Sequence, residues 1–314
     1  MTIALPREPW PARHWAAMPA NLRGAAWMLL SCLGFSVMAS FVKLAGREVS
    51  AFEITFFRCL FGLLALAPFV AWQGLGALRT RHLGMHAWRG ILGSMGMGCA
   101  YFGLSHMPMA SYNALSFSKP LFAVLLAVVI LHETVRWRRW AATGIGFVGV
   151  LIMMRPGTAA FDPNGLFALG DALTVAILIT VLKRLPAYET PIAMLFYFGI
   201  IASPFALVPA LFYWSWPDAA TWALLAAIGC SGALSQYWWI KAFRTGEASA
   251  IAPFDYSRLL FTGIIGLAFF SEVPDSWTVA GAALIVASTI YIARREARLN
   301  PAPSAVPAES AADI

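Results

Sequence analysis

Long apolar runs separated by short polar joins dominate the sequence. Ten runs are each about 20 residues long, enough for one helix to cross a hydrocarbon core about 30 Å thick. Several joins combine Pro or Gly with a charge, as in Arg155-Pro156-Gly157. We therefore predict an all-α integral membrane protein with ten transmembrane helices. The predicted spans cover residues 22–45, 52–72, 87–107, 109–131, 137–155, 165–184, 190–213, 219–242, 248–270 and 276–294.

Composition agrees with a chain whose main solvent is lipid. Apolar residues make up 60% of the 314 positions and charged residues only 12%. This excludes a disordered chain, a coiled coil and an ordinary cytosolic enzyme. The four cysteines are scattered singly in apolar stretches, so they indicate neither a disulfide framework nor a zinc site. We expect no cofactor and no metal.

The net charge of +7 reflects orientation in the membrane. With the N-terminus inside, sixteen of the 22 Lys and Arg residues fall in cytoplasmic segments and three in external loops. Basic residues favour cytoplasmic loops, so both termini are predicted to be cytoplasmic, as segments 1–21 and 295–314. The same distribution argues against a nucleic-acid partner. The remaining three cations, Arg58, Lys119 and Arg258, lie within predicted spans.

The two halves of the chain resemble each other. At an offset of 139 residues, Phe117-Ser118-Lys119 aligns with Tyr256-Ser257-Arg258, and Glu133 aligns with Glu272. The polar positions match as well as the apolar ones. Each half holds five predicted helices, residues 22–155 and 165–294, and an odd number makes the second copy enter the membrane in the opposite direction. We therefore predict two inverted five-helix repeats, a common plan of secondary transporters.

Motifs in both halves resemble those of the EamA-type transporters of the drug/metabolite transporter superfamily. The first half closes with Pro120-Leu-Phe and Leu131-His-Glu133, and the second contains Asp255-Tyr-Ser-Arg-Leu-Leu-Phe followed by Ser-Glu272-Val-Pro-Asp. The resemblance implies a multi-pass carrier of the bacterial inner membrane that works by alternating access. It implies neither a substrate nor a direction.

Two cations at mid-depth mark the predicted binding site. Lys119 and Arg258 each lie about ten residues into their spans, or about 15 Å deep, where a charge costs at least about 2.5 kcal/mol. Paired at the repeat interface, they suit a carboxylate or phosphate. The alternative is an internal ion pair of Arg258 with Asp255, one helical turn earlier. The predicted substrate-binding residues of the central cavity are Lys119, Arg258, Tyr256, Ser257, Asn113, Ser116, Trp239 and Tyr101.

Other residues carry weaker predictions with alternatives left open. Pro120, directly after Lys119, is expected to loosen its helix. Glu53 and Arg58 lie near the external end of the span 52–72. Asp171 and Asp255 are candidates for proton coupling, although a buried acid held by hydrogen bonds explains Asp171 equally well. Arg58 either reaches the interface or pairs with an acid, and Glu272 is expected to close a helix end against neighbouring backbone. Small residues at Gly90, Ser94 and Gly98 predict close helix packing.

The expected function is secondary active transport of a small organic metabolite, amino-acid-like or anionic, with export favoured. Uptake of a vitamin, cofactor or other metabolite is the alternative. A non-transporting integral membrane protein is a third hypothesis. No enzyme is expected, because P-loop, G-x-S-x-G and H-E-x-x-H motifs are missing from the sequence. The expected partners are a small-molecule substrate and the lipid bilayer, and a homodimer stays open.

Overall fold

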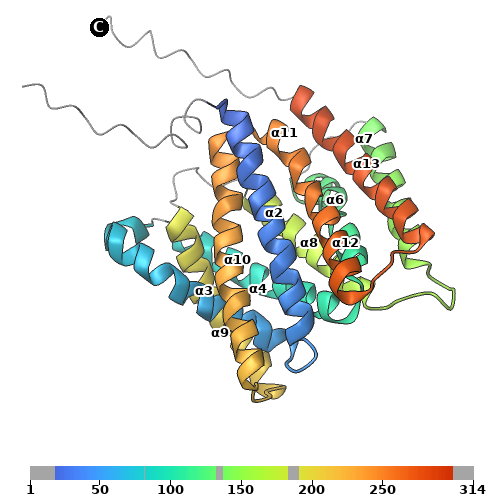
Figure 1. Ribbon diagram of the computed structural model, residues 1–314. Coiled ribbons are helices and arrows are strands. Elements are labelled where there is room, and N and C mark those ends of the chain that lie inside the picture. The colour runs from blue at the N-terminus through green and yellow to red at the C-terminus, as the bar shows by residue number, and fades with distance from the viewer. Residues whose placement is uncertain (1–17, 81, 132–136, 183–190, 300–314) are drawn as a thin grey trace, which may run out of the picture.

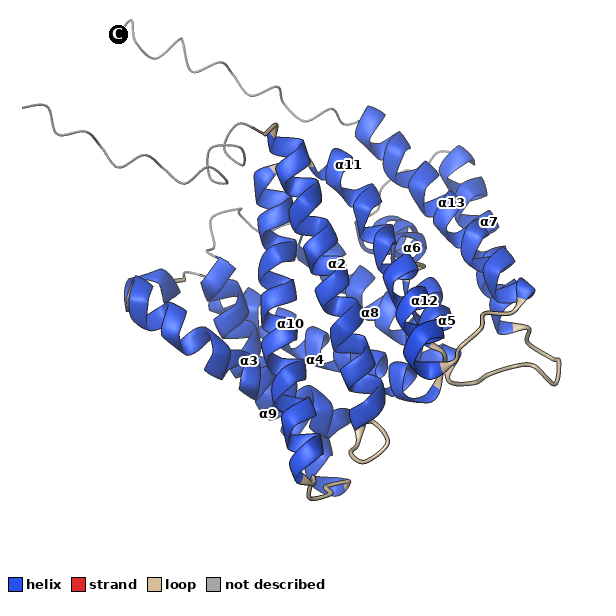
Figure 2. Ribbon diagram, in the orientation of Figure 1, coloured by secondary structure: helices blue, strands red, loops and turns tan. Residues whose placement is uncertain are grey.

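A computed structural model describes residues 18–80, 82–131, 137–182 and 191–299. These residues form a bundle of helices joined by short loops (Figure 1), and no strand occurs among them (Figure 2). The first helix begins and the last helix ends at the upper end of the bundle in Figure 1. Glu133, which the sequence analysis aligned with Glu272, lies outside the described residues.

The helices follow the predicted spans closely. The first half comprises α2 (Ala20–Ala45), α3 (Ala51–Gln73), η1 (Leu75–Leu78), α4 (Leu83–His106), α5 (Met109–Ser116), α6 (Lys119–Leu131) and α7 (Trp137–Met154). The second comprises α8 (Gly165–Leu182), α9 (Pro191–Phe212), α10 (Ala219–Thr245), α11 (Ala248–Ile251), η2 (Ala252–Tyr256), α12 (Ser257–Phe270) and α13 (Ser276–Leu299). The last helix continues past the predicted end at residue 294, so the predicted tail 295–314 starts within it.

Five described segments are long and apolar enough to cross a membrane, and the all-helical prediction is confirmed for the described residues. The five are Ala20–Ala45, Ala51–Trp72, Met109–Ile130, Ile192–Phe212 and Ala219–Thr245. Shorter apolar helices cover Gly165–Leu178 and Ser276–Ile292. The count of ten crossings stays a prediction.

The fourth and ninth predicted spans are broken rather than continuous. In the first half, α5 stops at Ser116 and α6 starts at Lys119; in the second, the 3-10 turn η2 separates α11 from α12. Proline explains both interruptions, because it has no backbone N–H and its ring crowds the preceding turn. Pro120 follows the first break, and Pro253 lies inside the second. The sequence predicted a loosened helix at Pro120 and none at Pro253.

Helices α3 and α10 begin with well-formed caps at the lower end of the bundle. Ser50 and Glu53 form a capping box at the start of α3, in which each side chain accepts from the backbone N–H of the other residue. Asp218 caps α10 by accepting from the backbone N–H of Thr221 at 2.7 Å. Glu53, one of the acids near the predicted external end of its span, is fully buried through this role.

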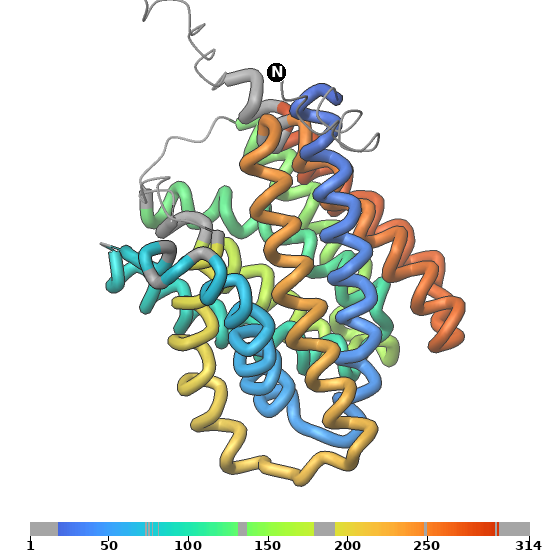
Figure 3. Tube along the Cα trace, turned by 60° about the vertical axis from the view of Figure 1, so that its left-hand side comes forward, coloured from blue at the N-terminus to red at the C-terminus, as the bar shows by residue number. Residues whose placement is uncertain are grey.

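The main helix contacts join the two halves. Helix α2 lies beside α10, as the blue and orange tubes of Figure 3 show, and α4 packs on α8. The pairs α3–α9, α5–α12 and α7–α13 also bring one element of each half together. The helices α2 and α4 correspond to α8 and α10 in the second half, so exchanging the halves turns the pair α2–α10 into α8–α4. The other three pairs each join two corresponding spans, so the exchange leaves them unchanged.

Glycine permits close contacts between helices of the two halves. A Cβ on Gly149 of α7 would lie 2.8 Å from the carbonyl oxygen of Gly281, and a Cβ on Gly281 of α13 would lie 2.6 Å from that of Gly149. In α4, a Cβ on Gly90 would lie 2.4 Å from Ile201 of α9. The close packing predicted from the small residues of span three is therefore confirmed at Gly90.

Candidate functional site

Both predicted cations lie where a broken span resumes its helix. Lys119 is the first residue of α6, and Arg258 is the second residue of α12. The first N–H groups of a helix have no partner within it and carry partial positive charge. A cation at this end of a helix is unfavourable unless an anion lies close by. Each cation has such an anion.

Asp171 of α8 compensates Lys119. Its Oδ2 atom lies 3.3 Å from Lys119 Nζ. The same oxygen accepts from the hydroxyl of Tyr112 at 2.9 Å and from that of Ser116 at 2.8 Å. Asp171 is only 5% exposed. Three donors therefore meet at one oxygen of a buried carboxylate. The sequence singled out Asp171, Lys119 and Ser116 separately, but neither their pairing nor the role of Tyr112 was predicted.

Asp255 of η2 compensates Arg258, as the ion-pair alternative expected. Arg258 Nη2 lies 3.6 Å from Asp255 Oδ1. The guanidinium also stacks on the ring of Phe35 in α2, with Cζ 4.5 Å from the ring centroid. Cys32 Sγ lies 3.6 Å from the same carboxylate oxygen of Asp255. Residues from α2, η2 and α12 therefore surround this cation.

Phe117 and Tyr256, each two residues before one of the cations, contact each other. These residues occupy equivalent positions in the two halves, and their ring centroids are 4.8 Å apart. The Tyr256 hydroxyl hydrogen-bonds to Thr289 Oγ1 of α13 at 2.5 Å. Arg258 is also within electrostatic range of Asp171 and Tyr112. We call the set Lys119, Asp171, Tyr112, Arg258 and Asp255 the polar centre.

The other predicted binding residues have mainly local contacts. Asn113 donates from Nδ2 to the carbonyl oxygen of Met109, one turn earlier in α5, at 2.9 Å. Tyr101, 3% exposed, places its hydroxyl 3.8 Å from the sulfur of Met97 and within electrostatic range of Asp171. The Ser257 hydroxyl oxygen is enclosed without a hydrogen-bond partner among the described residues. Trp239 packs edge-to-face on Phe243, the arrangement expected of a packing aromatic.

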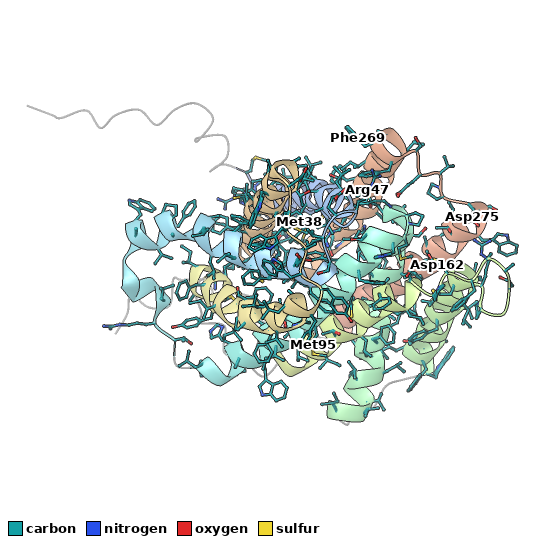
Figure 4. All side chains as sticks on the ribbon, turned by 90° about the horizontal axis from the view of Figure 1, so that it is seen from below. Met38, Arg47, Met95, Asp162, Phe269 and Asp275 are labelled. Carbon is teal, nitrogen blue, oxygen red and sulfur yellow. The ribbon has the colours of Figure 1, made fainter. Side chains whose placement is uncertain are left out.

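Two further ion pairs close the lower end of the bundle. Glu272, in the loop after α12, pairs with Lys43 of α2 and accepts from the backbone N–H of Met109 at 2.8 Å. The contact to Met109 agrees with the predicted role of Glu272 in closing a helix end. Asp275 pairs with Arg155 after α7. Figure 4, which looks onto this end, shows Asp275 there.

An apolar pocket lies between three helices that also carry residues of the site. Its volume is about 350 Å³, at the small end of the range for ligand pockets. It lies between α5, α12 and α13, which also carry Tyr112, Arg258 and the Tyr256 partner Thr289. Its walls include Ala110, Ala114, Leu259, Gly263, Thr278 and Val286. Among the described residues, no three His, Cys, Asp or Glu side chains are grouped to hold a metal ion.

The sequence matches the EamA-like transporter family over residues 22–155 and again over residues 164–294. These two segments include nearly all of the described helices. The chain belongs to the EamA-like transporter family. It is therefore a multi-pass membrane protein of the drug/metabolite transporter superfamily, as its sequence motifs predicted.

Named relatives within this superfamily carry different substrates. The S-adenosylmethionine uptake transporter of Rickettsia prowazekii is 36% identical over 88% of this chain and 94% of its own length. The riboflavin transporter of Vibrio cholerae is 30% identical over 88% of this chain and 95% of its own. The pseudopaline exporter CntI of Pseudomonas aeruginosa is 29% identical over 86% of this chain and 96% of its own. All three names are those of transporters, not enzymes.

The fold is shared with solved structures, among them a crystal structure of a protein. It aligns with a TM-score of 0.60 over 89% of this chain and 99% of that one, at 20% identity. At this level of identity the likeness shows the fold alone.

Proposed function

We propose that the chain is a secondary carrier of two inverted five-helix repeats that moves a small organic metabolite by alternating access. The observation that carries this proposal is the polar centre. Each half presents a cation at the start of a half-helix, and the repeat-related Phe117 and Tyr256 meet between them. Discontinuous helices at a repeat interface are the usual binding elements of such carriers. The exchange symmetry of the helix pairs supports the inverted repeat.

The proposed substrate is an amino-acid-like or anionic metabolite that carries a carboxylate, and S-adenosylmethionine, which has an amino-acid end, is the first to test. Its carboxylate would replace an internal carboxylate at Lys119 or Arg258. Its sulfonium and adenine could lie against Phe117 and Tyr256, because aromatic faces attract cations and stack on planar rings. The 36% identity to an S-adenosylmethionine uptake transporter supports this choice.

Uptake is the proposed direction, since the relative of highest identity among those named here is an S-adenosylmethionine uptake transporter. Export, which the sequence alone favoured, is the second candidate because of the likeness to a pseudopaline exporter. The bacterial inner membrane, with both termini in the cytoplasm, is the proposed location, supported by the sorting of the basic residues.

Asp171 is the proposed switch of the transport cycle. Asp171 neutralises Lys119 and accepts from Tyr112 and Ser116. A substrate carboxylate that binds Lys119 competes with Asp171, and a proton taken up by Asp171 would relieve the repulsion between the two carboxylates. This step couples transport to protons. A rate that does not change with a pH gradient across the membrane would count against it.

The test is uptake of labelled S-adenosylmethionine into liposomes that contain the purified protein. We expect Lys119→Ala and Arg258→Ala to abolish uptake while the purified variants stay folded. Arg47→Ala removes an exposed cation at the lower end and is the matched control. Wild-type rates in both site variants would exclude the proposed site.

The third hypothesis, a membrane protein that does not transport, makes the opposite prediction. Liposomes would then take up no metabolite from a panel of amino acids, organic acids, nucleotides and vitamins. The same preparation would modify or bind a lipid.

A further inference from the structure

Two arginines that the polar centre does not use converge on one phenylalanine. Arg58 of α3 places Cζ 5.9 Å from the ring centroid of Phe198 in α9, and Arg89 of α4 places Cζ 5.7 Å from the same centroid. A phenyl ring attracts a cation by about 0.5–2 kcal/mol, less than a carboxylate in the same place would. The ring therefore stabilises these charges only in part.

Neither guanidinium has an acidic partner within the part of the chain that the structure describes. Arg58 Nε and Arg89 Nη1 are each enclosed and lack a hydrogen-bond partner there. Buried donors are normally satisfied, and buried charges are normally paired. Ion-paired arginines such as Arg258 also leave one donor unfilled, so the distinguishing feature of Arg58 and Arg89 is that two cations share one neutral neighbour without an acid among the described residues. Such a pair is suited to a counter-ion from outside the chain.

The surroundings hold the two arginines in place. A Cβ on Gly93 of α4 would lie 2.4 Å from Cε2 of Phe198, so the ring is packed directly against that helix. A Cβ on Gly232 of α10 would lie 3.1 Å from Arg58 Nε, so α10 passes close to the guanidinium. Glycine at these two positions leaves room for the ring and the guanidinium.

One residue connects the arginine pair with the polar centre. Tyr101 is within electrostatic range of both Asp171 and Arg58. Arg89 lies in the second turn of α4.

We infer that Arg58 and Arg89 form an oxyanion site, separate from Lys119 and Arg258, that binds the carboxylate or phosphate of a ligand. The inference rests on the proposed carrier function for the identity of that ligand. The planar, five-donor guanidinium can bind either oxyanion through two parallel hydrogen bonds. A phosphate could also come from a lipid headgroup.

The first experiment compares S-adenosylmethionine with its decarboxylated analogue, which keeps the adenosine and the sulfonium but lacks the carboxylate. We expect Arg58→Gln and Arg89→Gln each to weaken binding of S-adenosylmethionine by about tenfold or more, and binding of the analogue by about twofold at most. Arg47→Gln is the control. Equal losses for both ligands, or no loss, would overturn an oxyanion site for the substrate.

Arg58→Lys keeps the positive charge and provides a second test in case Arg58→Gln does not fold. It should melt as the wild type does and recover part of the discrimination, because a lysine retains the attraction but not the bidentate fork. Full recovery by lysine would assign the effect to net charge alone and overturn the bidentate geometry.

The second experiment does not depend on the substrate. Inorganic phosphate and phosphatidylglycerol are titrated separately into protein purified in a neutral detergent, and the melting temperature is measured. A rise with phosphate that both glutamine variants lose supports the site even if the wild type binds no S-adenosylmethionine. A rise with phosphatidylglycerol alone, lost in the same variants, assigns the site to a lipid headgroup. No rise with either probe, together with no discrimination in the first experiment, refutes the site.

Discussion

At the scale of single residues, the fold brings Lys119 and Asp171 together from α6 and α8. Each is a charge that the bilayer disfavours, and each is tolerated because the other is 3.3 Å away. Removal of one partner from a buried pair leaves the other uncompensated, which is worse than removal of both.

This asymmetry gives a prediction for the pair. Asp171→Asn should lower the free energy of unfolding by about 3–5 kcal/mol, because Lys119 is left without a counter-charge. Adding Lys119→Met should restore most of the loss. The measurement is the melting temperature of the three variants in one detergent. A double variant as unstable as the single one would show that Asp171 stabilises the fold through Tyr112 and Ser116 instead.

Single residues also show which parts of the site could be predicted from the sequence and which could not. Lys119 and Arg258 were identifiable because a basic residue within an apolar span is rare. The Tyr112 hydroxyl gave no such signal, since a tyrosine near a helix end is common in membrane proteins. Arg58 was found, but its neighbours Phe198 and Arg89 lie on other helices and could not be assigned to it.

At the scale of the elements, glycine decides how closely α7 and α13 approach. Gly281→Ala should destabilise the protein by about 1–3 kcal/mol, because the new Cβ would lie 2.6 Å from the carbonyl oxygen of Gly149 and backbone must move. Gly144→Ala, on α7 with nothing within 4 Å of its Cβ, should be neutral or stabilising by about 0.5–1 kcal/mol. Thermal melting of both variants is the measurement, and equal melting temperatures would contradict the close contact.

The start of α13 gives a prediction on pH. Hydrogen bonds from Thr278, together with the Arg155 guanidinium, lower the pKa of Asp275 below its usual 3.8. A carboxyl whose pKa is lower in the folded state stabilises the fold above the unfolded pKa, and the effect is lost as pH falls through the folded pKa. Wild-type protein should therefore lose more stability between pH 5 and 3 than Asp275→Asn does, as measured by melting temperature. Identical pH profiles would refute this contribution, which is modest because Asp275 is exposed.

The helices also show how much of the secondary structure the apolar pattern could predict. Helix positions followed from runs of about 20 apolar residues, because backbone groups in lipid must bond within their own segment. The interruption near Phe117 was foreseen in part from Pro120. The interruption in the ninth span was not foreseen, although Pro253 lies inside the predicted span 248–270 and a proline within a helix is a signal for such a break.

At the scale of the whole molecule, ion pairs at the lower end join the halves. Glu272 binds Lys43 and the backbone of Met109, and thus holds α2, α5 and α12 together. Opening toward this end requires these contacts to separate. We call these contacts the latch, because they would hold this end closed in the proposed alternating-access cycle.

Weakening the latch should expose the interior from the lower end. In a Cys230→Ser background, which removes an exposed thiol, Glu272→Gln should increase the rate at which a membrane-impermeant thiol reagent labels the half-buried Cys99 of α4. A several-fold increase is expected, because the amide keeps the hydrogen bond from Met109 but loses the ion pair. Glu48→Gln, close to the same end, is the control. An unchanged rate would indicate that other contacts close this end.

The sequence by itself determined that the chain is a helical membrane protein of two similar halves, to which family it belongs, and which two cations stand at equivalent positions in those halves. These properties follow from composition, period and local motif. Only the tertiary structure decided which charges pair, that Phe117 meets Tyr256, and that Arg58 and Arg89 share Phe198. Such contacts depend on how each helix is rotated and placed against helices far away in the chain, as for Ser116 and Asp171, 55 residues apart. A linear pattern of apolar residues does not specify those rotations.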